Sequence, residues 1–118
     1  MKSNPLVEKS QELSFEILSL CSNLSTVKGI ANILNQLSRS GTSVNANIRE
    51  ANYPHSLSDM LAKLRIALKE CYETEGWLLT LFDHNHIPEA TFKPIRNKAG
   101  AIRRMLIASC KTIEGKLS

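Results

Sequence analysis

Apolar residues recur at three- and four-residue spacing in four long segments of this 118-residue chain. That period places them on one face of an α-helix, and long runs of the β-branched and aromatic residues typical of strands are absent. We therefore expect an all-α protein. The length suits one domain with a real core, and no repeat or linker divides the chain, so residues 1–118 should form a single domain.

The first two helices have recognisable ends. Asn4 and Pro5 suit the N-cap and first position of a helix, and a break is expected over residues 22–26. The second helix should start within residues 25–28 and end before Pro54.

The third and fourth helices are delimited in the same way. Ser56 and Asp59 fit a capping box, with Asp in place of the commoner Glu. A polar turn over residues 83–86 ends the third helix, and Pro88 fits the first turn of the fourth. The expected core stripe of the third helix is Leu57, Met60, Leu61, Leu64, Leu68, Cys71, Leu78, Leu79 and Phe82. The expected core stripe of the fourth helix is Phe92, Ile95, Ala99, Ile102, Leu106, Ile113 and Leu117.

Pro94 interrupts the fourth pattern, so that helix should kink there or start closer to Thr91. Four helices with short connections most simply pack as an antiparallel up-down-up-down four-helix bundle, about 30 to 40 Å long.

The segment SRSGTSVNANIREANY, residues 38–53, has the composition of a loop. However, Val44, Ile48 and Ala51 keep the helical spacing, so we expect the second helix to continue through it, with a possible bend at Gly41. A phosphate-binding Walker loop would need a second Gly-Lys pair and a preceding strand, which this segment lacks.

Catalytic and metal-binding chemistry are not expected. The three cysteines lie on or beside apolar stripes and suit reduced core residues of a cytoplasmic protein. Asp83, His84 and His86 suit a solvated turn better than a zinc site, and His55 lies a whole helix away. No membrane-spanning run, secretory signal or cofactor motif is present.

Surface residues suggest two kinds of contact. Ile66 and Trp77 point away from the core stripe of the third helix, on the side that also holds Glu70 and Glu73, and Phe15 lies off the stripe of the first helix. We expect self-association through these apolar residues. A buried polar link from Glu73 to Ser43 or Asn47 is also expected.

Basic residues give the other surface. The chain has 15 Lys and Arg against 11 Asp and Glu, a net charge of +4. Five of them fall in one sector of the fourth helix, from which Lys98 points away: Lys93, Arg96, Arg103, Arg104 and Lys111. They form either an ordinary solvated face or a phosphate-binding surface. No aromatic residue lies among them along this helix, so base stacking is not expected there.

The stretches SGTSVNANIREA (40–51) and KLRIALKECYETEGWLLTLF (63–82), with the four-helix pattern, resemble a known family. It comprises the four-helix-bundle proteins encoded in intervening sequences of bacterial large-subunit ribosomal RNA genes. Its relatives include the accessory variability determinants of diversity-generating retroelements. The similarity runs from about Leu6 to about Leu117.

The resemblance implies an antiparallel bundle that assembles into a homopentameric ring. It also implies a positively charged surface, which in the retroelement relatives binds nucleic acid and a reverse transcriptase. The positions that match the family motifs are Ser40, Gly41, Ser43, Asn47, Glu50, Glu70, Glu73, Thr74 and Trp77. Gly76 and Pro94 depart from the family pattern.

Two functional hypotheses follow. The first is a homo-oligomeric accessory protein that binds RNA or DNA, with a reverse transcriptase as a candidate partner. The alternative is a protein-interaction scaffold with no nucleic-acid role, and an enzyme is not expected.

Overall fold

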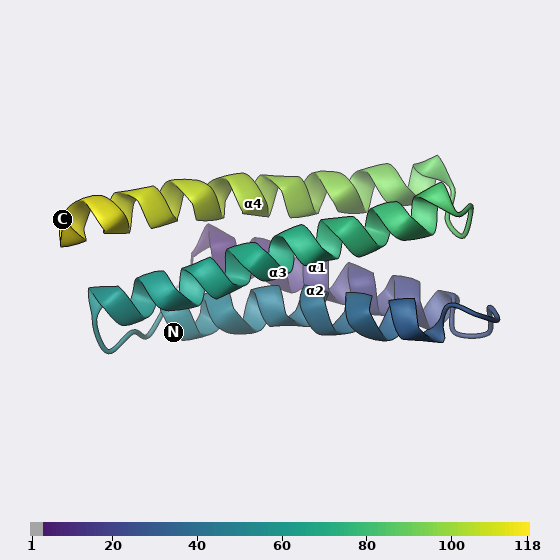
Figure 1. Cartoon of the computed structure of the whole chain (residues 1–118), viewed down its shortest axis with the longest axis horizontal. Helices are drawn as coiled ribbons and strands as arrows, with labels where there is room; N and C mark the ends of the chain where they lie inside the picture. The colour runs from purple at the N-terminus through teal and green to yellow at the C-terminus, as the bar shows by residue number, and fades with distance from the viewer. Residues whose placement is uncertain (1–3) are drawn as a thin grey trace.

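The protein is a bundle of four antiparallel helices, seen here in a computed structural model that describes residues 4–118. The helices are α1 (Pro5–Asn23), α2 (Ala31–Ala51), α3 (Leu57–Asp83) and α4 (Glu89–Leu117). Each packs beside the next, and α4 closes the bundle against α1 and α3 (Figure 1). The predicted all-α four-helix bundle is confirmed.

Side-chain caps start α1 and α3 where the sequence predicts. The Asn4 side chain accepts a hydrogen bond from the Val7 amide at 3.1 Å, and Ser56 accepts one from the Asp59 amide at 3.0 Å. Asp59 in turn accepts from the amide of His55, one residue earlier than in a standard capping box.

The predicted start of α2 is too early. The helix begins at Ala31, not within residues 25–28, because the chain passes through Gly29 with a φ of +86°. This left-handed conformation suits glycine and interrupts helical propagation. Ile30, which precedes the helix, is buried and provides no side-chain cap.

The core runs the length of the bundle, and three of the predicted core positions are wrong. Leu57, Leu79 and Leu117 are exposed, whereas Leu81 and Ile87 are buried. Leu57 and Leu117 lie at helix ends, where fewer neighbours cover them. Leu79 follows the fully buried Leu78, and adjacent residues point about 100° apart on a helix.

Helix α4 passes through Pro94 without ending. It begins at Glu89, so the predicted alternative of a start closer to Thr91 is wrong, and Pro88 is the N-cap rather than part of the first turn. Pro94 is exposed, so water can bond the backbone carbonyl that has lost its helical partner.

The bundle is longer than predicted, with a longest extent of 48 Å. The 29 residues of α4 alone span about 43 Å. Its C-terminal end extends beyond the other helices, while α1 is the shortest element (Figure 1). No helix in the described part of the chain is long and apolar enough to cross a membrane.

Small residues in the middle of α2 allow neighbouring helices to pack closely. A Cβ atom at Gly41 would lie 2.6 Å from Ile17 Cδ1 of α1, a distance at which one of the two must move. Ser40, on the α3 side, is fully buried and its Oγ lies 3.0 Å from Thr74 Oγ1. Residues 38–51 are therefore helix, and the loop interpretation is excluded.

Candidate nucleic-acid interface

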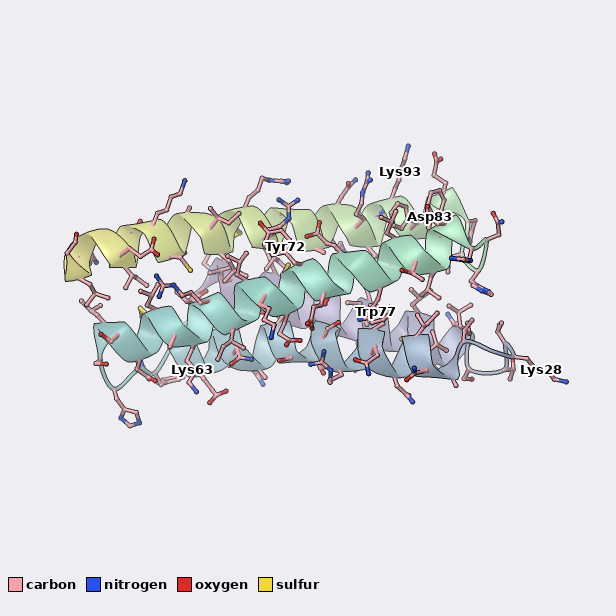
Figure 2. All side chains as sticks on the ribbon, in the orientation of Figure 1. Lys28, Lys63, Tyr72, Trp77, Asp83 and Lys93 are labelled. Carbon is pink, nitrogen blue, oxygen red and sulfur yellow. The ribbon has the colours of Figure 1, made fainter. Side chains whose placement is uncertain are left out.

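The predicted basic sector of α4 runs from the side that adjoins α3, where Arg103 lies, to the side that faces away from the bundle, where Lys93 lies. Arg103 reaches Glu75 of α3, and Glu114, from the same sector, reaches Arg65 of α3. Lys98 pairs instead with Glu16 of α1, on the opposite side, as its predicted direction requires. Figure 2 shows Lys93 extending from α4 away from the bundle.

We call this region the α3/α4 basic surface and define it by the residues that line it. They are Arg65 and Tyr72 of α3, and Lys93, Arg96, Arg103, Arg104 and Lys111 of α4.

Three ion pairs neutralise part of this surface. Arg103 Nε lies 2.8 Å from Glu75 Oε2, and this hydrogen bond is the main cause that raises the pKa of Arg103. Lys93 pairs with Glu89 at 3.0 Å, one turn earlier in α4. The third pair is the contact between Arg65 and Glu114.

The other three cations have no acidic partner within residues 4–118. They are Arg96, Arg104 and Lys111. The Arg96 guanidinium lies 5.1 Å from the centroid of the Phe92 ring. A Cβ atom at Gly100 would be 3.4 Å from Arg104 Nη1 and 3.5 Å from Arg103 Nη2, so both guanidinium groups lie against this glycine. The surface thus carries three positive charges in excess of its paired ones.

Tyr72 and Arg65 belong to this surface but were not predicted from the sequence. Tyr72 is half-exposed, and the Arg103 guanidinium carbon lies 5.7 Å from the centroid of its ring. The expected lack of base stacking concerned aromatic residues of α4 alone, and nothing in one sequence tells which turn of α3 packs beside Arg103. An i, i+7 spacing of Arg65 and Tyr72 on α3 is the only available signal.

The carboxylates of α3 on the α2 side have a different partner from the predicted one. Arg39 Nη1 lies 3.1 Å from Glu70 Oε2, and Arg39 Nη2 lies 2.9 Å from Glu73 Oε2. Glu70 is buried and faces α2, so its predicted place on an outward face is wrong. The predicted link from Glu73 to Ser43 or Asn47 is also wrong, because an arginine from the preceding turn of α2 is close enough to hold both carboxylates.

Two other motif residues of α2 also have local or neighbouring partners. The Asn47 side-chain amide donates to the Ser43 carbonyl at 2.9 Å and to Ser43 Oγ at 3.1 Å, within its own helix. Glu50 forms an interhelical ion pair with Lys63 of α3 at 3.5 Å.

Of the three candidate interface residues, Phe15 lies on α1, and Ile66 and Trp77 lie on α3. Phe15 is 71% exposed on α1, beside the half-exposed Leu18, and Ile66 is exposed on α3. Trp77, which Figure 2 labels between α3 and α2, packs partly against the core. It also lines a hollow of about 370 Å³ with residues of both helices. Because α1 and α3 are diagonal neighbours, Phe15 and Ile66 cannot form one patch on one subunit. Their role in self-association stays a prediction.

The cysteines lie on three different helices, and His84 and His86 lie in the connection between α3 and α4. In the part of the chain described here, no group of three His, Cys, Asp or Glu side chains could hold a metal ion. The three cysteines are free thiols and buried, as predicted. Burial is the main cause that raises the pKa of Cys71 to about 12.

Comparison with known proteins agrees with the fold. A family model described as 23S rRNA-intervening sequence protein matches residues 2–108. A crystal structure of a protein with unknown function, from the S23 ribosomal protein family of Bacteroides thetaiotaomicron VPI-5482, superposes with a TM-score of 0.86. The two sequences are 38% identical, over 90% of this chain and 98% of the other. No curated protein matches the chain.

Proposed function

The chain belongs to the 23S rRNA-intervening sequence protein family, and from this premise we propose that it is a non-enzymatic, homo-oligomeric accessory protein that binds RNA or DNA. The proposed binding region is the α3/α4 basic surface. The observation that carries the proposal is the excess of positive charge left by Arg96, Arg104 and Lys111 on one side of the bundle.

The geometry suits contact with a phosphate backbone. Arg96, Arg104 and Lys111 are spaced by eight and seven residues along one rigid helix, which is about 10 to 12 Å per step. Contacts of this kind neutralise phosphates and release counterions, so they are independent of base sequence and weaken steeply with salt. In a ring of identical subunits the same surface would be repeated around the assembly.

The test is binding to RNA and DNA as a function of salt, with a charge-matched control. The triple variant Arg96→Glu, Arg104→Glu, Lys111→Glu should lose binding, and the slope of log affinity against log salt should flatten. The control variant Lys9→Glu, Lys28→Glu, Arg49→Glu has the same net charge but changes exposed residues elsewhere. Equal losses in both variants would show that net charge, and not this surface, causes binding.

Self-association is the second part of the proposal, with a homopentamer as the expected state. Phe15 and Leu18 give α1 an exposed apolar pair that its own subunit leaves uncovered. Light scattering should give the mass of a pentamer, and the substitution Phe15→Glu should lower it. A monomeric wild-type protein at micromolar concentration would contradict this part.

The exposed apolar pair also supports the alternative function, a protein-interaction scaffold. A reverse transcriptase is the candidate partner for both versions. Under the scaffold alternative, wild-type protein would bind neither RNA nor DNA at low salt, whereas the Phe15→Glu variant would lose its protein partner.

A further inference from the structure

We propose that Tyr72 is a stacking platform for an unpaired nucleobase, so that the α3/α4 basic surface prefers single-stranded nucleic acid to duplex. This inference rests on the proposed function, and it adds a class of ligand and a contact residue to it.

Tyr72 is held next to a fixed cation with much of its ring in solvent. Its residue exposure is 52%, and the Arg103 guanidinium lies 5.7 Å from the ring centroid. Glu75 holds that guanidinium through hydrogen bonds from Arg103 Nε at 2.8 Å and Nη2 at 3.4 Å. Figure 2 places Tyr72 where α3 and α4 lie side by side. The Arg103 guanidinium therefore orients the ring, while about half of the Tyr72 surface stays open to a ligand.

The other aromatic residues near this surface are already occupied. The Phe82 and Phe92 rings stack on each other with centroids 4.4 Å apart, and Arg96 lies over Phe92. Phe92 is buried. Tyr53 is also exposed, but it follows α2 at the opposite end of the bundle from that stacked pair. Tyr72 is thus the ring that the basic surface offers to an incoming base.

Phosphate-binding groups lie on both sides of Tyr72 along the bundle axis. Arg103, which marks the level of Tyr72 on α4, is seven residues after Arg96 and eight before Lys111, or about 10 to 12 Å from each. Arg104 lies at the same level, against Gly100. A backbone that follows α4 can therefore contact Arg96, Arg104 and Lys111 while one base turns toward α3.

Only an unpaired base can make this contact. Bases in a duplex are stacked on their neighbours and hydrogen-bonded, whereas bases of a single strand can splay out onto aromatic side chains. Stacking tolerates any base, because each has a flat π surface, so no sequence preference is expected from Tyr72. Arg103, which is already held by Glu75, orients the ring and adds a guanidinium plane beside it.

The experiment measures binding by fluorescence anisotropy at low salt, with oligouridine RNA, oligothymidine DNA and an RNA duplex of equal length as probes. The variants are Tyr72→Ala, Tyr72→Phe and, as a matched control, Tyr53→Ala. Removal of Tyr72 should weaken single-strand binding by roughly 5- to 150-fold and leave duplex binding unchanged. The phenylalanine and control variants should bind as wild type does.

Comparison of the RNA and DNA single strands shows whether Tyr72 stacks with bases of both nucleic acids or of one of them. An equal loss of affinity for RNA and DNA supports stacking that does not depend on the sugar. A loss of affinity for one of them alone supports a platform specific to that nucleic acid. An unchanged affinity of Tyr72→Ala for both single strands would overturn the inference. An equal loss on single strands and duplex would also overturn it, because that result means a role in maintaining the surface.

The inference and the proposed function fail in different ways. If the Arg96, Arg104 and Lys111 reversals abolish binding while Tyr72→Ala does not change it, the function stands and the platform is wrong. If wild-type protein binds none of the probes, both are wrong. Tyr72 is exposed and outside the core, so the substitution should leave the thermal unfolding curve unchanged, which verifies that the variant is folded.

Discussion

Two arginines of this bundle cross from one helix to carboxylates of α3, and the results are opposite in charge. Arg39 of α2 binds both Glu70 and Glu73, so this cluster carries one net negative charge. Arg103 of α4 binds Glu75 alone and lies beside Arg104, so its cluster carries one net positive charge. Each arginine makes a similar interhelical ion pair, yet only the second leaves a cation for an outside ligand.

The difference teaches that the residual charge, and not the number of arginines, marks a phosphate-binding surface. We call the Arg39 cluster closed because its one cation is shared between two carboxylates, and the Ser40–Thr74 hydrogen bond lies near the buried Glu70. The Arg103 cluster is open, with a half-exposed Tyr72 at its edge. We therefore expect the first cluster to act on stability and the second on binding.

The largest expected effect separates the two clusters directly. The substitution Arg39→Ala leaves the buried Glu70 carboxylate without a donor, and an unsatisfied buried acceptor costs about 1 to 3 kcal/mol. Urea unfolding should show this loss, and nucleic-acid affinity should not change. The substitution Arg104→Ala should instead weaken nucleic-acid binding and change the free energy of unfolding by no more than about 0.5 kcal/mol. Weaker RNA binding by Arg39→Ala would break the distinction.

Alkaline pH should destabilise the protein through the thiol below the open cluster. Cys71 is fully buried and its Sγ lies 3.2 Å from the Ala99 carbonyl; burial, and secondarily the charge of Glu75, raise its pKa from 9.0 to about 12. The unfolded chain then releases this proton first, so stability is full below pH 9 and falls between pH 9 and pH 12. The loss at pH 10 should be about 1.4 kcal/mol.

Urea unfolding at pH 8 and pH 10 measures this loss. The variant Cys71→Ser keeps a donor near the Ala99 carbonyl but does not titrate in this range. It should therefore show a clearly smaller drop between the two pH values. An identical drop in wild type and variant would assign the pH dependence to other groups, including Cys21 and Cys110, whose pKa values burial also raises.

The hydrogen bond below the closed cluster should have a smaller effect. The substitution Thr74→Val keeps the side-chain shape but removes the contact between Thr74 Oγ1 and Ser40 Oγ. Ser40 still donates to the Leu37 carbonyl, so the expected cost is about 1 kcal/mol. A drop in the thermal midpoint with unchanged nucleic-acid binding would agree with a purely structural role.

The smallest effect concerns the partner of each arginine. Glu75→Gln should leave Arg103 as an additional uncompensated cation, so that log affinity for RNA falls more steeply with log salt, by about one unit of slope. Glu73→Gln makes the same change in net charge, but Arg39 keeps Glu70 as its partner. The second variant should keep the wild-type slope. Equal slopes of log affinity against log salt in the two variants would mean that RNA binding depends only on the net charge of the protein.

Much of the fold could be predicted from the sequence because it depends on spacing along each helix. The Ser56 cap and the continuation of α2 through Gly41 are local geometry and are confirmed, and the periodic stripes are confirmed apart from Leu57, Leu79 and Leu117. The start of α2 could not be predicted as well, since it depends on the backbone conformation at Gly29.

The candidate site could be predicted only in part, because its composition depends on contacts between helices. The sector of Lys93 to Lys111 follows from the helical period, but the partners of Arg103 come from α3. The same limit explains the wrong partner for Glu73, which depends on which turn of α2 faces it. One sequence gives the direction of a side chain on its own helix and not the neighbour that it meets.

The order of the helices has a consequence for folding. Consecutive helices pack together, so most contacts are local in sequence, and chains of this kind fold fast. During synthesis α1, α2 and α3 precede α4, and the sides of α1 and α3 that α4 covers stay unpartnered until it is made. The arrival of α4 completes the hydrophobic core and brings Arg103 to Glu75 at the same step. A nascent chain therefore acquires its basic surface only when it becomes a closed bundle.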